Sequence, residues 1–157
     1  MTYTVRPMNT EEYHLLDDFL YEAIFVPEGV SPPPRDITSR PELKVYTDGF
    51  GSRKGDTAVA AEYGGMVVGA AWARIMDDYG HIDDYTPSLA ISLYKEHRGH
   101  GAGTAMMQAL LGILKSAGYS SVSLAVQKAN YALRMYRKAG FKVIGENDEE
   151  YIMVCDV

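Results

Sequence analysis

The segment Arg98–Gly103, with the sequence Arg-Gly-His-Gly-Ala-Gly, is the part of the chain best suited to bind an anion. Glycine adopts backbone angles that other residues avoid, and it leaves space for several N–H groups to approach one ligand. The first N–H groups of a helix have no partner within it, and the helix dipole adds positive potential there. A glycine turn between a strand and a helix therefore predicts a phosphate-binding site, to which Thr104 would add a hydroxyl group and Arg98 and Lys95 positive charge.

The spacing of the glycines excludes two common phosphate-binding motifs. A P-loop ends in Gly-Lys-Ser/Thr, whereas this turn ends in Gly103-Thr104 and contains no lysine. A dinucleotide-binding fingerprint needs glycine at position 104 or 106, where the chain has Thr104 and Met106. Until the surroundings are considered, a turn that serves only tight packing is the alternative to a ligand site.

The predicted elements place the turn between a strand and a helix. Residues Ser88–Tyr94 have the short apolar body of a strand. Residues Gly101–Ala117 carry a helical stripe of apolar side chains, and Gly118 ends that helix. The strand–helix–strand unit from Ser88 to Val126 predicts a right-handed crossover between two parallel strands that are neighbours or near-neighbours.

The remaining pattern predicts an α/β (α+β) fold in one domain, residues 1–157, with a mixed, mostly antiparallel twisted sheet flanked by about four helices. The other predicted strands are Thr2–Met8, Thr57–Tyr63, Met66–Met76, Ser121–Val126, Phe141–Gly145 and Glu150–Asp156. The other predicted helices are Thr10–Ile24, Pro41–Asp48 and Ala129–Ala139. The segment Val26–Pro41 has five prolines and predicts a functional surface loop.

Composition excludes several classes of protein. The 157 residues are 46% apolar and 23% charged, as is typical of a globular domain. No apolar run reaches the length of a membrane span, and the first residues lack the pattern of a signal peptide. The lone Cys155 excludes an internal disulfide and a cysteine-based zinc site, and no metal is predicted. These features predict a cytoplasmic protein with no membrane partner.

Charge is distributed unevenly along the chain. The net charge of −6 argues against general nucleic-acid binding. The stretch Lys95–Lys142 nevertheless holds eight basic residues and one acid, so it predicts a surface that attracts an anionic ligand. The part of the chain through Tyr94 holds 15 acidic and 7 basic residues.

Residues 87–142 resemble the GNAT superfamily of N-acetyltransferases, and the resemblance covers nearly the whole chain. The glycine turn fits every fixed position of that family's pyrophosphate-binding pattern, Arg/Gln-x-x-Gly-x-Gly/Ala. The family's later pattern follows in the right order and comprises Asn130, Ala132, Tyr136, Gly140 and Phe141. The resemblance implies a GNAT-like fold, acetyl-CoA as co-substrate and transfer of its acetyl group to a primary amine by direct attack on the thioester. The alternative is a non-catalytic protein of the same fold that binds or senses acyl-CoA.

The resemblance also implies a donor site and two catalytic roles. The residues expected to contact acetyl-CoA are Leu93, Arg98, Gly99, Gly101, Ala102, Gly103, Thr104, Asn130 and Tyr136. A bulge in the fourth strand is expected to turn backbone N–H groups, that of Leu93 among them, toward the thioester. Tyr136 is expected to protonate the leaving thiolate, since a phenol stays protonated at pH 7; simple helix packing is the alternative for this residue.

The chain departs from the family pattern at three places. Asn130 precedes Tyr136 by six residues where seven is commoner, and His100 stands where Lys or Arg is frequent. The start of the fourth strand, Pro87-Ser88-Leu89, has no carboxylate to act as a general base. Candidates for that base lie in loops and are His81, Asp83, Asp84 and Glu28, with a chain of water molecules as the alternative.

The acceptor is predicted only as a class. The family implies that it binds against the loop Val26–Pro41 and the fourth-strand side. The acids of the first 94 residues suggest a cationic molecule such as a polyamine, an aminoglycoside or a lysine-bearing peptide. Acids that only keep the protein soluble are the alternative. The family's habit also implies a homodimer as one possible state.

Overall fold

The structure, a computed structural model, describes residues 2–157, which build one seven-stranded sheet in the order β1-β2-β3-β4-β5-β7-β6. The strands are β1 (Thr4–Pro7), β2 (Thr57–Tyr63), β3 (Met66–Arg74), β4 (Ser88–Leu93), β5 (Ser121–Gln127), β6 (Lys142–Glu146) and β7 (Glu150–Asp156). The helices are α1 (Leu16–Ala23), α2 (Pro41–Lys44), α3 (Ala102–Ser116) and α4 (Leu133–Ala139), with 3-10 helices at Thr10–Leu15, Arg35–Ser39 and Lys95–His97. Only β4 and β5 pair in parallel, so the predicted mixed, mostly antiparallel sheet is confirmed.

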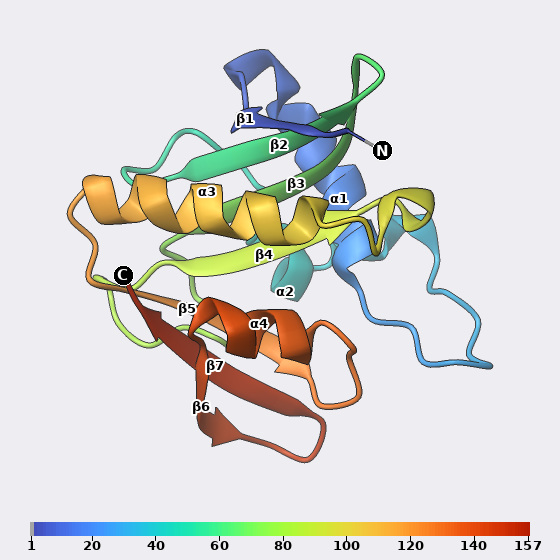
Figure 1. The fold of residues 1–157 in the computed structure, drawn as a ribbon. Coiled ribbons are helices and arrows are strands. Elements are labelled where there is room, and N and C mark those ends of the chain that lie inside the picture. Colours follow the sequence, from blue (N-terminus) through green and yellow to red (C-terminus); the bar gives the residue numbers. More distant parts are fainter. Residues whose placement is uncertain (1) are drawn as a thin grey trace.

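Two helical layers cover the two faces of the sheet. Helices α3 and α4 lie on one face, while α1 and α2 lie on the other (Figure 1). Because side chains alternate along a strand, β2 and β3 contribute side chains to the hydrophobic cores on both faces of the sheet. Val59 and Ala71 pack with Met106 and Leu110 of α3, whereas Trp72 packs on the opposite face. The core on that face is formed by Met8, Leu16, Phe19, Leu20, Ala58, Ala60, Ala70 and Trp72.

Strands β4 and β5 separate soon after they meet. Their pairing is confined to Ser88 and Ser123, where the hydroxyl groups also lie 3.3 Å apart. Beyond this point no strand lies beside β4 on the β5 side within residues 2–157. The parallel neighbours expected from the crossover are therefore present, but they enclose a gap in the sheet that opens toward the glycine turn.

The bulge expected in the fourth strand is not present. The β3–β4 register runs unbroken from Arg74–Ser88 to Gly69–Leu93, and that expectation was wrong for these residues. Register shifts occur instead in β2 at Ala61/Glu62 and in β6 at Val143/Gly145. The divergence of β5 already frees the β4 backbone, so no bulge is required to expose it.

Several helix boundaries differ from the sequence-based expectation. The helix predicted from Thr10 is a 3-10 helix as far as Leu15 and an α-helix only from Leu16 to Ala23. The helix predicted from Ala129 begins at Leu133, because the Asn130 side-chain oxygen accepts a hydrogen bond from the N–H of Ala132 and forms a local turn instead.

A buried ion pair fixes the loop that leads into β2. Arg74, at the end of β3, donates to both carboxylate oxygens of Asp56 at 3.0 and 2.8 Å, and the two side chains are 0% and 1% exposed. Arg74 also donates to the carbonyl oxygens of Val45 and Asp48, and its guanidinium lies over the ring of Phe50.

Every described helix is too short or too polar to cross a bilayer.

Candidate functional site

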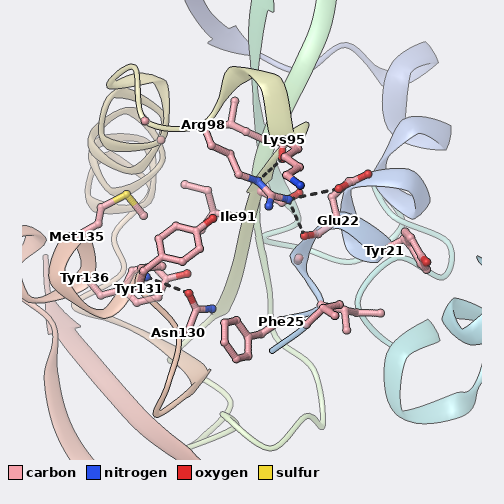
Figure 2. A pocket seen from close by; sticks show the side chains of 18 of the residues that line it. Tyr21, Glu22, Phe25, Ile91, Lys95, Arg98, Asn130, Tyr131, Met135 and Tyr136 are labelled. Atoms are coloured by element: carbon pink, nitrogen blue, oxygen red, sulfur yellow. Dashed lines mark hydrogen bonds and ion pairs between the residues drawn. The ribbon is translucent and has the colours of Figure 1, made fainter. Parts of the chain in front are cut away.

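A cavity of about 660 Å³ opens where β4 and β5 separate. This volume is within the range of about 300–1,000 Å³ that small-molecule sites occupy. The glycine turn and β4 form one side, α4 and the turn before it form a second, and the segment after α1 forms the third (Figure 2). Eight of the nine residues predicted to contact the donor line it, namely Leu93, Arg98, Gly99, Gly101, Gly103, Thr104, Asn130 and Tyr136.

The glycine turn, where the sequence predicts a site for an anion, lies at the start of α3. Gly99 and Gly101 have φ angles of +79° and +88°, which favour glycine strongly, and Gly101 is the N-cap of the fifteen-residue helix. Free N–H groups of the first helical turn therefore face the cavity mouth. Gly103 lies close to α4, since a Cβ there would meet the Met135 sulfur at 3.3 Å.

Ala102 is the predicted donor residue that does not line the cavity. Its side chain is buried in the core beneath α3, so any contact with a ligand would come from its backbone N–H. This division is expected at a helix start, where successive side chains point to different sides while the first N–H groups share one direction.

The β4 backbone presents hydrogen-bond donors to the cavity. The N–H of Tyr94 donates to Val68 in β3 at 3.0 Å, and residues on an antiparallel strand alternate in the side to which they donate. The N–H groups of Leu93 and Ile91 consequently point away from β3, toward the gap left by β5. The carbonyl oxygen of Leu93 points the same way and accepts a hydrogen bond from Arg98 Nε at 3.0 Å.

Tyr136 places a phenol at the inner end of the cavity. It is 8% exposed, packs edge-on against Phe141, and makes no hydrogen bond through its hydroxyl to any of residues 2–157. Burial and, to a smaller extent, nearby Tyr131 raise the pKa of this phenol well above its ordinary value. The group therefore stays protonated and keeps a donor available for a ligand.

Glu22, which the sequence analysis did not single out, lies in the cavity wall. Its carboxylate is 3.3 Å from Arg98 Nη2, which also donates to the Glu22 backbone oxygen (Figure 2). The two residues are 76 positions apart, and no local pattern marks their contact. Ser92, whose buried hydroxyl donates to the Phe19 carbonyl at 2.6 Å, holds α1 against β4 and so places Glu22 there.

The four residues considered as a general base do not line the cavity. Glu28 is exposed in the proline-rich loop, and Asp83 and Asp84 are exposed in the crossing before β4. His81 is in the same crossing, 3.9 Å from Asp84. The loop Val26–Pro41 does reach the cavity, through Val26, Pro32 and Pro33. Within residues 2–157, no cluster of three or more His, Cys, Asp or Glu side chains is arranged to hold a metal ion.

Comparison with known proteins agrees with the geometry. The sequence model described as "Acetyltransferase (GNAT) family" matches residues 18–141. N-acetyltransferase 8B of Homo sapiens is 29% identical over 113 residues, which are 71% of this chain and 50% of that protein. The chain thus spans about half the length of the curated relatives it matches.

Solved structures share the fold over their whole length. An N-acetyltransferase of Staphylococcus aureus Mu50 superposes with a TM-score of 0.72 at 19% identity, with 99% of each chain covered. The paia N-acetyltransferase of Thermoplasma acidophilum, solved in complex with coenzyme A, gives a TM-score of 0.73 at 18% identity, with 100% of each chain covered. At these identities the likeness is one of fold.

Proposed function

The chain belongs to the acetyltransferase (GNAT) family, and from this we propose that it transfers the acetyl group of acetyl-CoA to a primary amine. The observation that carries the proposal is the cavity between β4 and β5, which joins an anion seat, free backbone donors and a buried phenol in one site. The predicted cytoplasmic location and homodimer stay predictions.

Donor binding would use the glycine turn and the strand gap. The pyrophosphate would accept hydrogen bonds from the N–H groups at the start of α3, with Arg98 and Lys95 supplying positive charge at the same mouth. Gly99, Gly101 and Gly103 keep that backbone accessible, and the hydroxyl of Thr104 is a further donor. The acyl-bearing arm would then extend along β4 toward Tyr136, past Asn130 at the turn before α4.

Backbone donors would polarise the thioester. The N–H of Leu93, with that of Ile91 beside it, faces the gap and would donate to the carbonyl oxygen as negative charge develops on it. A donor held in place for such an oxyanion typically contributes a factor of about 10²–10³ in rate. Because the register of β4 against β3 is regular, this donor is held by the sheet itself.

The reaction itself moves an acetyl group and one proton. The neutral amine nitrogen attacks the thioester carbon, a C–N bond forms, and the C–S bond breaks. The nitrogen loses a proton and the sulfur gains one, so the net proton movement is from nitrogen to sulfur. Tyr136 would donate a hydrogen bond to the departing sulfur, and any proton that it passes to the sulfur would be replaced by the one that the nitrogen loses. Because burial raises the pKa of its phenol well above that of a thiol, Tyr136 keeps this proton at neutral pH until the C–S bond breaks.

Release of free thiol from acetyl-CoA, measured across a panel of primary amines, tests the proposal. We expect Tyr136→Phe to lower kcat by a factor of about 10²–10⁴ while leaving the affinity for CoA within about threefold. Tyr85→Phe is the matched control, since Tyr85 is 81% exposed and does not line the cavity. Full turnover by Tyr136→Phe would refute its role, and CoA binding without turnover on any amine would favour the acyl-CoA-sensing alternative.

A further inference from the structure

The wall of the cavity that faces the glycine turn is almost entirely apolar. It comes from the end of α1, the segment that follows, and the proline-rich loop, and it presents Ala23, Ile24, Phe25, Val26, Pro32 and Pro33. The ring of Phe25 points into the cavity toward Asn130 and Tyr131 (Figure 2). Such a wall favours an apolar ligand body, because burying it removes apolar surface from water on both partners.

A single carboxylate interrupts this wall. Among the described residues that line the cavity, Glu22 is the one acid. Its contact with Arg98 is 3.3 Å long, whereas a strong pair of this type lies at about 2.7–2.9 Å. The Glu22 side chain is 30% exposed, so the carboxylate keeps acceptor capacity that a ligand ammonium group can use.

The other acids of the first 94 residues do not line the cavity, and five of them are paired with arginines. Arg35 holds Asp17 and Asp18, with distances of 3.0 and 2.6 Å. Arg6 pairs with Glu12 and Glu62, and Arg74 pairs with Asp56. The excess of acidic residues in this part of the chain is therefore not found in the cavity lining. A ligand with several positive charges would meet only one carboxylate there.

Glu22 also lies beside the proposed reacting position. The guanidinium of Arg98 donates through Nε to the Leu93 carbonyl and through Nη2 to Glu22, so one planar group connects the two. An ammonium group held by Glu22 would lie in the gap next to the Leu93 N–H, while its body lies on Phe25 and the paired prolines. It would pass one proton to the Glu22 carboxylate or to water before its nitrogen attacks the thioester.

We propose that the acceptor is a primary amine with a single positive charge on an apolar body, bound through Glu22 and the wall formed by Phe25, Pro32 and Pro33. This inference rests on the proposed acetyl transfer. It names a narrower class than the cationic acceptors that composition suggests, and it disfavours polyamines and aminoglycosides, which carry several charges on short or polar frames.

The kinetic test compares five amines by thiol release from acetyl-CoA. We expect kcat/KM for 2-phenylethylamine and hexylamine to exceed those for ethanolamine, spermidine and kanamycin by about tenfold or more, because only the first two bury an apolar body. Higher kcat/KM for spermidine or kanamycin would overturn the inference while leaving the transfer reaction intact. Equal values for hexylamine and ethanolamine would overturn the role of the apolar wall.

Two variants assign the contacts to individual residues. We expect Phe25→Ala and Glu22→Gln each to raise KM for 2-phenylethylamine by about tenfold, with KM for acetyl-CoA changed less than threefold. Glu28→Gln is the matched control. Glu28 is an exposed acid of the proline-rich loop, and it does not line the cavity. If Phe25→Ala instead raised KM for acetyl-CoA alone, the apolar wall would belong to the donor and the inference would fail.

A binding measurement separates this inference from the proposed function. Calorimetry of 2-phenylethylamine added to the protein saturated with CoA needs no turnover. Binding that weakens in Phe25→Ala and in Glu22→Gln would support the acceptor class even if no amine released thiol, in which case the transfer reaction alone would be refuted. No binding of 2-phenylethylamine, together with binding of spermidine, would refute the acceptor class.

Discussion

Two arginine–carboxylate pairs in this protein have the same chemistry and opposite surroundings. Arg74 and Asp56 are buried and joined by two hydrogen bonds, and two backbone carbonyl oxygens accept hydrogen bonds from Nη1 of Arg74. The side chains of Arg98 and Glu22 are about one-third exposed and line the cavity. Arg98 Nη2 lies 3.3 Å from Glu22 Oε2. Four of the five N–H groups of the Arg74 guanidinium are used within the protein, whereas the second pair keeps hydrogen-bond capacity for other molecules.

The difference indicates what each pair stabilises. A buried pair that makes several hydrogen bonds to the chain fixes one arrangement of that chain, and removing one partner leaves a charge without compensation. A half-exposed pair contributes little to the free energy of unfolding, since water replaces most of what is lost. We therefore expect the Arg74–Asp56 pair to govern stability and the Arg98–Glu22 pair to govern ligand binding.

The largest effect is expected from breaking the buried pair. Asp56→Ala should lower the free energy of unfolding by about 3–5 kcal/mol, because Arg74 would remain buried without its partner. Chemical denaturation measures this. Replacing both residues, as Arg74→Met with Asp56→Leu, should recover part of the loss. A loss below about 1 kcal/mol in Asp56→Ala would contradict the expectation that the Arg74–Asp56 pair governs stability.

Breaking the pair at the cavity should change binding more than stability. Arg98→Ala removes a positive charge at the mouth and a donor to the Leu93 carbonyl, so we expect the Kd for CoA to rise about tenfold, or roughly 1.4 kcal/mol. The free energy of unfolding should fall by less than about 1 kcal/mol. Calorimetry and denaturation of the same variant give both numbers, with Arg40→Ala, an exposed site outside the cavity, for comparison.

A third pair, between Arg6 and Glu12, should give the smallest effect and a pH dependence. The hydrogen bonds from Arg6 hold the pKa of the Glu12 carboxyl at about 2, below its ordinary value of 4.5. Because the folded-state pKa is depressed, the stabilisation is complete above about pH 4.5 and disappears as the pH falls toward 2.

Glu12→Gln tests this third pair. At pH 7 the variant should lose about 1 kcal/mol or less, and the difference from the unmodified chain should shrink as denaturation is repeated at lower pH down to 2.5. A difference that stays constant over this range would mean that the carboxylate charge plays no part in the loss.

Local patterns were sufficient to predict the elements on the side of the cavity where we propose that the donor binds. The turn Arg98–Gly103, the strand before it and α3 after it are consecutive in sequence, and each has its own periodicity or glycine signal. The neighbouring strands Thr57–Tyr63 and Met66–Met76 were predicted from their own periodicity, and they pair through a turn at Gly64 and Gly65, both of which have positive φ angles. Where conformation is set within a few residues, the sequence sufficed.

The wall proposed to bind the acceptor depends on contacts between distant residues. Glu22 faces the cavity because Ser92 holds α1 on β4 and because Arg98 reaches across 76 positions, and neither contact leaves a local pattern. The base candidates His81, Asp83, Asp84 and Glu28 were chosen from loop position alone, which does not determine where a side chain lies. The bulge in β4 was inferred from the resemblance, and it is absent. What exposes the β4 backbone is the separation of β5 from β4, which depends on how the two halves of the sheet pack.

The single contact between β4 and β5 has a consequence for how this site can evolve. A ligand seat built from backbone N–H groups, at a gap in a sheet and at a helix start, places few demands on the side chains around it. Substitutions that preserve the gap and the glycines would leave that seat in place. The fold tolerates such drift, as the TM-score of 0.72 at 19% identity shows, and selection for new acceptors can act on the opposite wall independently.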